Sequence, residues 1–326
     1  MKTQTITIIG LDRVGASIGL AIKNSPLDVT LIGHDPNDEK GQVALKTIEA
    51  IDKFEINLAQ AARKADILVI TAQTADIQSI LQVVGTEVQP HTLVIDLSSL
   101  KRQGLDWAKI YMQQGHYVGA VPVLAAEYLA DGRSQTSSAT PDLFKNSALC
   151  IMPSPKADPQ AVETAVNFGI LLGALPYFVD PDEYDGLMQG TETLPALLSL
   201  AMFNSLQQSI GWRDMLRFAG QPFALSTLAL ENDRNIPLYA LQNKQATLRW
   251  LDALMAELKA VRRLVYDEED EILAALAEQM AIERGKWLDS RQNNDWDERQ
   301  TAPIERRSMA DHLFGGLIRR GDKKDE

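Results

Sequence analysis

Cysteine is almost absent from this 326-residue chain, in which Cys150 is the single example. One cysteine excludes an intramolecular disulfide and a thiolate metal cluster, so we expect a protein of the reducing cytoplasm without a metal site. Basic residues are few, 32 against 44 acidic ones, and the net charge of −12 excludes the basic face that nucleic-acid binding requires. Apolar runs of membrane-spanning length are missing, and no signal peptide is expected, because Lys2 leads directly into a strand-like segment.

The first 35 residues carry the most informative pattern of the chain. Residues 6–9 are a short apolar, β-branched run typical of a buried strand, and GLDRVG at 10–15 is followed by an apolar-periodic helix pattern. A second β-branched run, 29–32, leads to Gly33-His34-Asp35. This order of strand, glycine-rich turn, helix, strand and acid predicts a dinucleotide-binding unit. The expected cofactor-binding residues are Gly10, Leu11, Asp12, Arg13, Val14, Gly15 and Asp35.

The turn departs from G-x-G-x-x-G at its middle position, where Asp12 replaces the glycine that lets the backbone approach a pyrophosphate. The Asp12 carboxylate could bind the free amides of the helix N-terminus in place of a phosphate, which would weaken the cofactor site. Arg13 could instead pair with Asp12, or offset its charge and reach a phosphate. Gly10 and Gly15 serve the tight turn and the close packing of helix on strand with or without a ligand. Asp35 favours NAD over NADP, because an acid at this position repels a 2′-phosphate.

Strand-like and helix-like patterns alternate up to about residue 180. Strands are predicted at residues 65–70, 92–96, 117–121, 149–152 and 175–179, and helices at 57–64, 77–84, 105–114 and 159–172. This alternation predicts an α/β fold whose N-terminal part is a Rossmann-like, doubly wound, mostly parallel sheet. Ligands of such sheets lie at the carboxyl ends of the strands, where Gly10, Asp35, Asp96 and Val121 are expected to gather.

From residue 182 the pattern is all-helical and rich in Leu, Ala, Glu, Gln and Met. Helices are predicted at 183–210, 222–230, 236–264 and 266–290, and the acidic run 267–271 is typical of a solvated helix start. We therefore expect a dinucleotide-binding domain over residues 1–180 and a C-terminal all-helical domain over 181–290. Residues 291–326 are expected to form a polar tail, whose short amphipathic segment, 309–320, docks on the body or on a partner.

Four local sequences carry a resemblance to a known family. They are IIGLDRVGASIGLAIK at residues 8–23, VIDLSSLK at 94–101, VGAVPV at 118–123, and VDPDEYDGL at 179–187 followed by ETLPA at 192–196. Over about residues 5–290, their order and spacing resemble the glycine-rich start and the D-x-G-S-x-K, V-G-x-H-P-M, D-P-x-x-H-D and S-H-L-P-H motifs of the prephenate/arogenate dehydrogenase family. The resemblance implies a homodimer through a helical substrate and dimerisation domain. It also implies NAD- or NADP-dependent oxidation of prephenate, arogenate or a related carboxylated small molecule, with loss of carbon dioxide.

The chain departs from this family at its catalytic positions. The histidine of V-G-x-H-P-M, which polarises or deprotonates the substrate hydroxyl in the family, is Val121 here, and valine cannot accept a proton. Tyr184 replaces the histidine of D-P-x-x-H-D, and Thr193 and Ala196 replace both histidines of S-H-L-P-H. His116 enters the strand of Val121 from its opposite end. None of the four histidines, His34, His91, His116 and His312, falls on a family catalytic position.

Retained polar residues supply the candidate catalytic and substrate-binding groups. The resemblance implies that Ser99 hydrogen-bonds a substrate oxygen or the nicotinamide, and the alternative is a helix N-cap. Proton transfer would fall to Ser99, Tyr184 or a water. Lys101 faces an anionic ligand, or it is a solvated surface lysine. Arg213 and Arg217 bind a substrate carboxylate in bidentate fashion, or they belong to a charge set on a helix surface.

Two functions stay open on this evidence. The chain is an NAD(P)-dependent oxidoreductase of this family, or it is a catalytically inactive homologue that keeps the fold as a binding or regulatory module. The replacements at Asp12, Val121, Tyr184, Thr193 and Ala196 fall together on positions that bear chemistry, while the scaffold motifs persist. Relaxed selection on catalysis would leave such a pattern.

Overall fold

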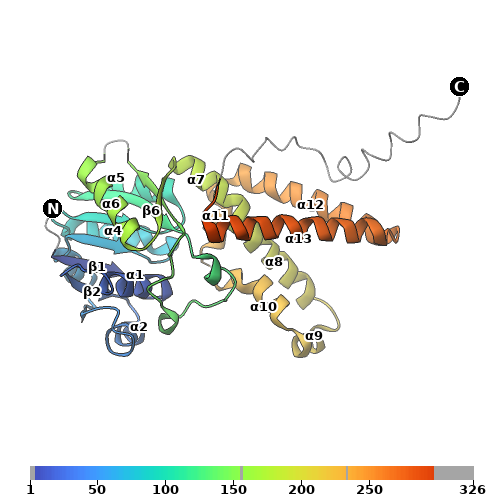
Figure 1. Ribbon diagram of the computed structural model, residues 1–326, viewed down its shortest axis with the longest axis horizontal. Helices are drawn as coiled ribbons and strands as arrows, with labels where there is room; N and C mark the ends of the chain where they lie inside the picture. Colours follow the sequence, from blue (N-terminus) through green and yellow to red (C-terminus); the bar gives the residue numbers. More distant parts are fainter. Residues whose placement is uncertain (1–3, 155–156, 233, 297–326) are drawn as a thin grey trace, which may run out of the picture. The chain divides into compact units, whose positions relative to one another are not determined.

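A single sheet organises the N-terminal part of the protein. The computed structural model describes residues 4–154, 157–232 and 234–296, which divide between two compact units, Met1–Lys244 and Gln245–Glu326. Within the described part of the first unit, eight strands form one sheet in the order β3-β2-β1-β4-β5-β6-β7-β8 (Figure 1). The strands are β1 (Thr5–Ile9), β2 (Thr30–His34), β3 (Lys53–Phe54), β4 (Ile67–Ile70), β5 (Leu93–Asp96), β6 (His116–Pro122), β7 (Ala148–Pro153) and β8 (Leu175–Phe178).

The pairing of these strands gives the sheet its doubly wound topology. Neighbouring described strands are parallel except β6 and β7, which run antiparallel with Val121 opposite Cys150. β2 and β4 flank β1 on its two sides, so the direction of winding reverses there. Ligands of such sheets bind at this reversal, outside the carboxyl ends of the strands. The predicted Rossmann-like, mostly parallel sheet followed by helices is confirmed.

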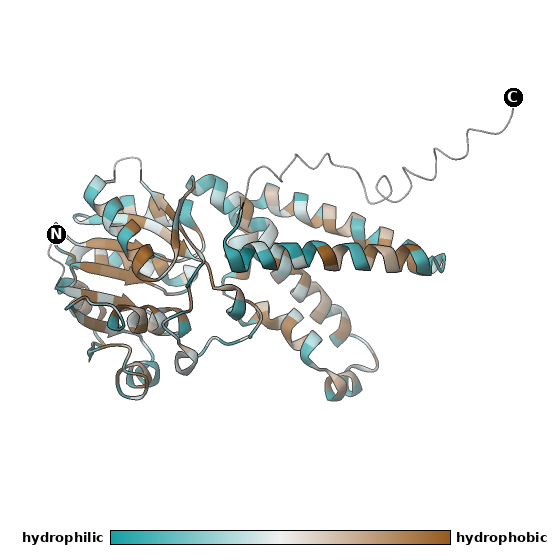
Figure 2. Ribbon diagram, viewed as in Figure 1, coloured by the Kyte–Doolittle hydropathy of each residue, from teal (hydrophilic) through white to brown (hydrophobic). Residues whose placement is uncertain are grey.

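Alternate side chains of the central strands pack into two hydrophobic cores, one on each face of the sheet. The helices between the strands are α1 (Arg13–Lys23), α2 (Asp38–Gln42), η1 (Val43–Thr47), α3 (Leu58–Arg63), α4 (Thr74–Glu87), α5 (Lys101–Tyr111), η2 (Ala126–Tyr128), η3 (Thr136–Ser138) and α6 (Pro159–Leu171). In β4, Ile67 and Val69 join the core with α1 and α6, while Leu68 and Ile70 join the core with α3, α4 and α5. Burial on both faces explains the continuous apolar runs of the sequence, and the strands are strongly hydrophobic in Figure 2.

Beyond β8 the described part of the first unit is helical. Its elements are α7 (Pro181–Met188), η4 (Gln189–Thr193), α8 (Leu194–Gln207), α9 (Trp212–Phe218), α10 (Gln221–Thr227), η5 (Leu228–Asn232) and α11 (Ile236–Gln242). The prediction of one helix over 236–264 is wrong, because the backbone leaves the helical region at Asn243, with φ −123° and ψ 61°. The change from strands to helices falls between β8 and α7, whereas the compact units divide after Lys244. The domain limits drawn at residues 180 and 290 therefore stay a prediction.

The second unit contains α12 (Lys244–Tyr266), which begins at the end of the first unit, and α13 (Asp270–Asn293). Asp270 and Glu271 are exposed in the first turn of α13, as expected for an acidic helix start. α13 extends to Asn293, so the first three residues of the predicted polar tail are helical. His312 and the predicted docking segment 309–320 lie outside the described residues. None of the described helices combines the length and the apolar character needed to cross a membrane.

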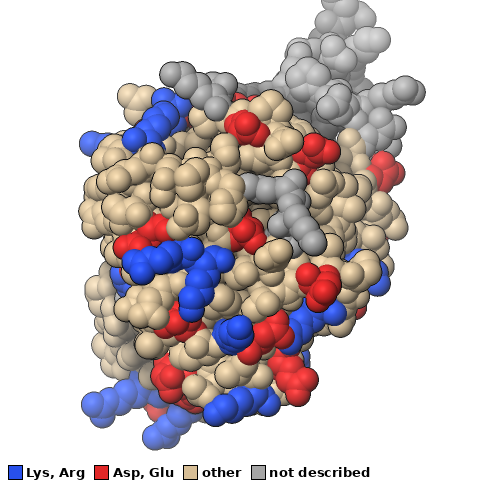
Figure 3. All heavy atoms as spheres, turned by 90° about the vertical axis from the view of Figure 1, so that its left-hand side faces the viewer, with Lys and Arg blue, Asp and Glu red and all other residues tan. Residues whose placement is uncertain are grey.

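Charges of both signs are interspersed at the surface. On the face seen in Figure 3, lysines and arginines lie beside aspartates and glutamates, so the acidic excess is not concentrated there. Ion pairs of the first unit include Lys23–Asp52 at 2.7 Å and Arg63–Glu87 at 2.5 Å. Solvent-exposed pairs of this kind contribute at most about 1 kcal/mol each to stability. The fold therefore depends mainly on its two apolar cores.

Candidate functional site

The glycine-rich turn has the backbone geometry that the sequence predicts. Gly10 has a φ of 94°, and a Cβ on Gly15 would lie 2.0 Å from the carbonyl oxygen of Gly10. Both positions therefore require glycine, the first for the turn and the second for the close approach of α1. Asp35 is buried at the end of β2, where Oδ2 accepts a hydrogen bond from the Leu11 amide at 2.9 Å and Oδ1 accepts one from the Asn37 amide at 2.8 Å. The acid thus holds the turn against the second strand.

Asp12 stands at the N-cap position of α1, but its side chain makes no capping hydrogen bond. Its Oδ1 pairs with Lys40 Nζ at 2.5 Å instead. The hypothesis that Asp12 acts as an internal anion on the helix amides is therefore wrong, because the carboxylate makes no capping hydrogen bond and pairs with a lysine of α2. The N-terminus of α1 keeps its positive dipole end without a side-chain cap, which is the environment that an anion prefers.

Arg13 is buried, and its side chain bonds residues 131–138. Its Nη1 and Nη2 donate to Oδ1 and Oδ2 of Asp131 at 2.7 and 2.6 Å, and further hydrogen bonds reach the carbonyl oxygens of Arg133 at 2.9 Å and Ser138 at 3.1 Å. The guanidinium also lies 5.2 Å from the ring centroid of Tyr128. The alternative that Arg13 pairs with Asp12 is therefore wrong, and these partners occupy the guanidinium that was expected to reach a phosphate. The hydrogen bond from Arg13 is also the main cause that lowers the pKa of Asp131.

The partners of Arg13 belong to a segment that we call the covering loop, residues 126–140 between β6 and β7. The main-chain amide of Arg13 donates to the Ser134 carbonyl at 3.1 Å. Thr136 Oγ1 donates to the carbonyl of Leu11 at 2.7 Å, and the Thr140 amide donates to Ser17 Oγ at 3.0 Å. The covering loop is thus hydrogen-bonded to the glycine-rich turn and to the first turns of α1.

The residues present fit a dinucleotide, with one contact altered. Gly10, Gly15 and the buried Asp35 have the geometry that the adenosine side of such a ligand requires, and no side chain caps α1. The Arg13 amide is a normal type of pyrophosphate donor, yet it is bonded to Ser134. A pyrophosphate would have to displace this carbonyl or use the remaining amides.

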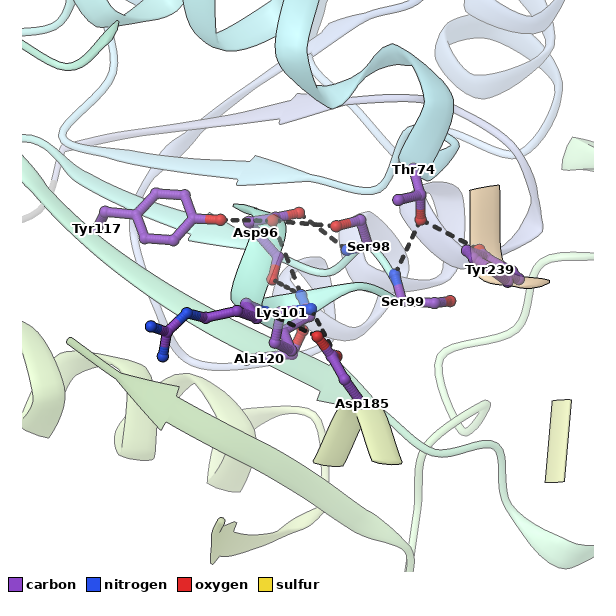
Figure 4. Close-up of polar contacts among 10 residues, drawn as sticks. Thr74, Asp96, Ser98, Ser99, Lys101, Tyr117, Ala120, Asp185 and Tyr239 are labelled. Carbon is purple, nitrogen blue, oxygen red and sulfur yellow. Dashed lines mark hydrogen bonds and ion pairs between the residues drawn. The ribbon is translucent and has the colours of Figure 1, made fainter. Parts of the chain in front are cut away.

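Lys101 lies in a buried polar cluster at the carboxyl end of β5 (Figure 4). Its Nζ donates to the carbonyl oxygens of Asp96 at 2.8 Å and Ala120 at 3.0 Å, and lies 3.8 Å from Asp96 Oδ2. Asp96 Oδ2 also accepts hydrogen bonds from Tyr117 OH at 2.6 Å and Ser98 Oγ at 3.0 Å. Burial lowers the pKa of Lys101 and raises that of Tyr117. The prediction that Lys101 is a solvated surface lysine is wrong, because the side chain is buried. Its ammonium group donates to main-chain carbonyls of the protein, whereas the other prediction gave it a ligand anion as its partner.

Asp185 caps α5 from outside the helix. Its Oδ1 and Oδ2 accept hydrogen bonds from the amides of Lys101 at 2.8 Å and Arg102 at 2.9 Å, the first two residues of α5. Burial raises the pKa of Asp185, and the two amides oppose that rise. The interpretation of Ser99 as the N-cap is wrong, because Leu100 stands at the cap position and the capping oxygens come from α7.

Ser99 belongs to a second, more exposed polar group at the same strand end (Figure 4). Its amide donates to Thr74 Oγ1 at 3.1 Å, and Thr74 Oγ1 is hydrogen-bonded to Tyr239 OH, also at 3.1 Å. The Ser99 hydroxyl lies beside Tyr239 and the carboxyl of Glu192, and its interaction with each group lowers the pKa of that group. Burial raises the pKa of Tyr239, so this phenol stays neutral at physiological pH. Ser99 therefore lies between a phenol and a carboxyl group.

Glu192 is the residue of this group that the sequence analysis missed. It comes from η4, a π-helical turn, and π-helical turns are frequent at functional sites. Its side chain keeps contact with solvent, while the protein crowded around the carboxyl raises the pKa of Glu192 to about 7, against an interaction with Ser99 that lowers it. One feature of the sequence could have revealed it, because Glu192 is the only charged residue between Asp185 and Arg213.

Other candidate residues contribute no described hydrogen bond to this group. Tyr184 is buried, and desolvation raises its pKa far above the ordinary value, so its phenol does not serve as a base near neutrality. Val121 is half-buried near the carboxyl end of β6, while His116 begins that strand at the opposite end, as predicted. Arg213 and Arg217 are exposed on α9, which lies at the end of the helical region away from the sheet (Figure 1).

The arginines of α9 match the surface alternative better than the substrate-binding one. Arg217 Nη1 lies 3.9 Å from Asp214 Oδ1, with both side chains more than three-quarters exposed (78% and 76%). The structure brings neither Arg213 nor Arg217 to Ser99 within the described residues of this chain. Their assignment to a substrate carboxylate stays a prediction without geometric support.

The sheet order, the glycine-rich turn and Asp35 define a dinucleotide-binding Rossmann domain of the oxidoreductase type, followed by helices. Residues 18–175 match the family described as prephenate dehydrogenase, nucleotide-binding domain, so the match begins within α1, beyond Asp12 and Arg13. Prephenate dehydrogenase of Bacillus subtilis (strain 168) is 26% identical over 275 residues, which are 83% of this chain and 72% of that protein. The strand-rich part of the chain thus matches the nucleotide-binding domain of prephenate dehydrogenases, and most of the chain is similar to a prephenate dehydrogenase.

Solved structures share the fold at lower sequence identity. Prephenate dehydrogenase from A. aeolicus, in complex with hydroxyphenyl propionate and NAD+, is 18% identical with a TM-score of 0.71, covering 88% of this chain and 99% of that chain. Synechocystis arogenate dehydrogenase is 19% identical with a TM-score of 0.63, covering 87% of this chain and 100% of that chain. At these identities the likeness concerns the fold alone.

Proposed function

We propose that this protein is an NAD-dependent oxidoreductase that acts on prephenate, arogenate or a related carboxylated cyclohexadienol. The observation that carries the proposal is the position of Ser99, a partly exposed hydroxyl at the end of β5 tied to Tyr239 and Glu192. It lies at the same edge of the sheet as the carboxylate of Asp35. Relatives that oxidise prephenate, or that hold NAD+ and hydroxyphenyl propionate together, support this choice of substrate and cofactor.

Each residue has a defined task in this proposal. Asp35 receives the ribose hydroxyls and disfavours a 2′-phosphate, which supports NAD over NADP. Bound NAD would supply the acceptor for the hydride that leaves the substrate carbon. Ser99 orients the substrate hydroxyl by a hydrogen bond, and its own position is fixed by the hydrogen bond from its amide to Thr74. Lys101 has a structural task only, because its ammonium anchors the ends of β5 and β6.

A homodimer through the helical domain is part of the proposal. Apolar side chains stand exposed on the helical part of the first unit, with Ile210 fully exposed and Phe218 84% exposed. Large exposed apolar side chains are typical of surfaces that a partner covers. Sedimentation analysis of the purified protein would test this, and a monomer at micromolar concentration would refute it.

A cofactor titration followed by an assay tests the function. We expect NAD to raise the melting temperature and to change the tryptophan fluorescence at millimolar concentration, and NADP to do so less. We also expect nicotinamide reduction on addition of prephenate or arogenate. Absence of any response to millimolar NAD would refute the proposal.

That negative result would favour the second candidate, an inactive homologue that serves as a binding or regulatory module. The hydrogen bond from the Arg13 amide to Ser134 is the observation that favours this alternative, because it occupies a donor that a pyrophosphate would use.

A further inference from the structure

The proposed oxidation needs a proton acceptor that the histidines described in the structure do not supply. His34 Nδ1 lies 2.9 Å from the carbonyl of Glu55 at the end of β2, and His91 Nε2 lies 2.9 Å from Asp66 Oδ1. His116 begins β6, at the amino end of the sheet. The position of the family histidine is Val121, which carries no titratable group. A different group must therefore accept the proton of the substrate hydroxyl.

We propose that Glu192 is the catalytic acid–base residue of this site and takes the place of the missing histidine. This inference rests on the proposed function. Glu192 is carried by η4, which packs against α11, the helix of Tyr239, and its carboxyl interacts with the Ser99 hydroxyl, the group expected to bind the substrate oxygen. Glu192 is exposed and Ser99 partly so, which leaves both groups accessible to a small molecule.

The surroundings hold this pair in position. Ser99 is held through its main chain, because its amide donates to Thr74 Oγ1 at 3.1 Å. Tyr239 is itself hydrogen-bonded to Thr74 at 3.1 Å. Glu192 is carried by η4, whose neighbours Gln189 and Thr193 are buried. A base and its hydrogen-bond partner on well-packed elements are pre-organised for proton transfer.

The electrostatic environment suits proton transfer at neutral pH. The elements packed against η4 are α7, α8 and α11. From α7 and α11, the titratable groups that interact with Glu192 are Tyr184 and Tyr239, and burial raises the pKa of both, so they stay neutral. α8 has no titratable side chain, and Asp185 of α7 is bonded to the α5 amides. With a pKa of about 7, Glu192 is the group here that changes charge near neutrality.

The step balances as a two-electron oxidation. The proton of the substrate hydroxyl passes to the Glu192 carboxylate, directly or by way of Ser99, which gives up one proton as it receives another. The electron pair of the broken O–H bond forms the carbonyl as the C–H hydride leaves to the nicotinamide. The bond to the ring carboxylate then breaks with release of carbon dioxide, and its electron pair completes the aromatic ring as a phenolate. The phenolate oxygen takes the proton back from Glu192, so the product is a phenol and Glu192 ends the reaction ionised.

Kinetics across pH test the proposal. In the full-length protein, we expect turnover to rise with pH through about 7, because the ionised carboxylate is the base. Glu192→Gln should reduce kcat by about 100-fold or more and remove this rise, with unchanged NAD affinity and melting temperature. The matched control is Glu183→Gln, which changes an exposed carboxyl on α7 and should leave rate and pH profile as in the unmodified protein. Equal kcat and an equal pH profile in Glu192→Gln would overturn the role of Glu192 and leave the proposed function standing.

A binding measurement provides a readout that needs no turnover. Hydroxyphenyl propionate carries a phenol that can donate to Glu192, and neither of its own groups titrates near pH 7. With NAD present, we expect its affinity to increase from about pH 6 to about pH 8 as Glu192 ionises, and to stay constant in Glu192→Gln. A pH-independent affinity in the unmodified protein would overturn the proposal. Absence of turnover in a protein that binds NAD would instead refute the proposed function, and this inference with it.

Discussion

Replacement of Asp131 by asparagine tests the contact between the covering loop and the glycine-rich turn. Asp131 binds Arg13 through two hydrogen bonds of 2.7 and 2.6 Å, with side chains 22% and 6% exposed. Removal of one member of a buried ion pair costs about 3–5 kcal/mol. Arg13 keeps the carbonyls of Arg133 and Ser138, and asparagine keeps one acceptor, so we expect the free energy of unfolding to fall by about 2 kcal/mol.

Urea unfolding at several pH values measures this loss. Because Arg13 lowers the pKa of Asp131, its contribution is present above the unfolded-state pKa and is lost as the pH falls through the folded-state value. The stability difference between Asp131→Asn and the unmodified protein should therefore be full at neutral pH and shrink in acid. The control is Asp142→Asn, which removes an exposed 3.5 Å pair with Lys145 and should cost at most about 0.5 kcal/mol. Equal stabilities at neutral pH, or a difference that persists in acid, would refute the reasoning.

The same variant shows whether the covering loop competes with the cofactor. If the Ser134 carbonyl must leave the Arg13 amide before a pyrophosphate binds, the apparent affinity is reduced by the rarity of the open state. If Asp131→Asn weakens the closed state of the loop by about 2 kcal/mol, the variant should bind NAD more tightly, by up to about 30-fold. Weaker binding in Asp131→Asn would mean that the loop shapes the turn for the ligand.

Three further substitutions probe other parts of the site. Gly15→Ala would place a Cβ 2.0 Å from the Gly10 carbonyl oxygen, so it should lower the free energy of unfolding by about 1–3 kcal/mol and abolish NAD binding. The control is Gly186→Ala, whose Cβ would meet no atom within 4 Å and which should change neither stability nor NAD binding. Thermal unfolding measures the stability, and fluorescence titration measures the binding. Lys101→Met leaves the Asp96 carboxylate buried without its cation and should cost about 3 kcal/mol in urea unfolding, so a stability equal to that of the unmodified protein would contradict the structural role. Val121→His adds an imidazole near the end of β6 and should raise turnover at least about 10-fold, and an unchanged rate in a folded, NAD-binding variant would show that the site has diverged further.

Local sequence patterns were sufficient for the fold. The run at β4 is apolar at every position, and the run at β5 is apolar up to Asp96, because both faces of the sheet are covered; this makes strands in a parallel sheet easy to recognise. The tasks of Gly10 and Gly15 were equally predictable, since they depend on backbone conformation close to the turn. Helix limits were less predictable where tertiary contacts decide them, as at Asn243.

The side-chain partners of the site were not predictable from the sequence. Arg13 finds Asp131, which lies 118 positions further along the chain, and no local pattern connects them. Lys101 is fully buried, although lysine is almost never buried without a partner, and its acceptors are set by the packing of β5 against β6. Ser99 was found through its motif, whereas Glu192 joins it only because η4 packs beside α11, the helix that carries Tyr239.

The residues that replace the two histidines of the S-H-L-P-H motif have a structural role in this fold. Thr193 and Ala196 are buried, 2% and 7% exposed, so these positions now serve packing. Glu192, one residue earlier, remains exposed beside Ser99 although its surroundings disfavour the charged form. A glutamine would keep the interaction with Ser99 without the cost of ionisation, so a scaffold that had lost catalysis has no physical need for a carboxyl there. An ionisable group held against this electrostatic cost at the substrate-binding serine is what a transferred acid–base function requires, and this favours a relocated catalytic group over an abandoned site.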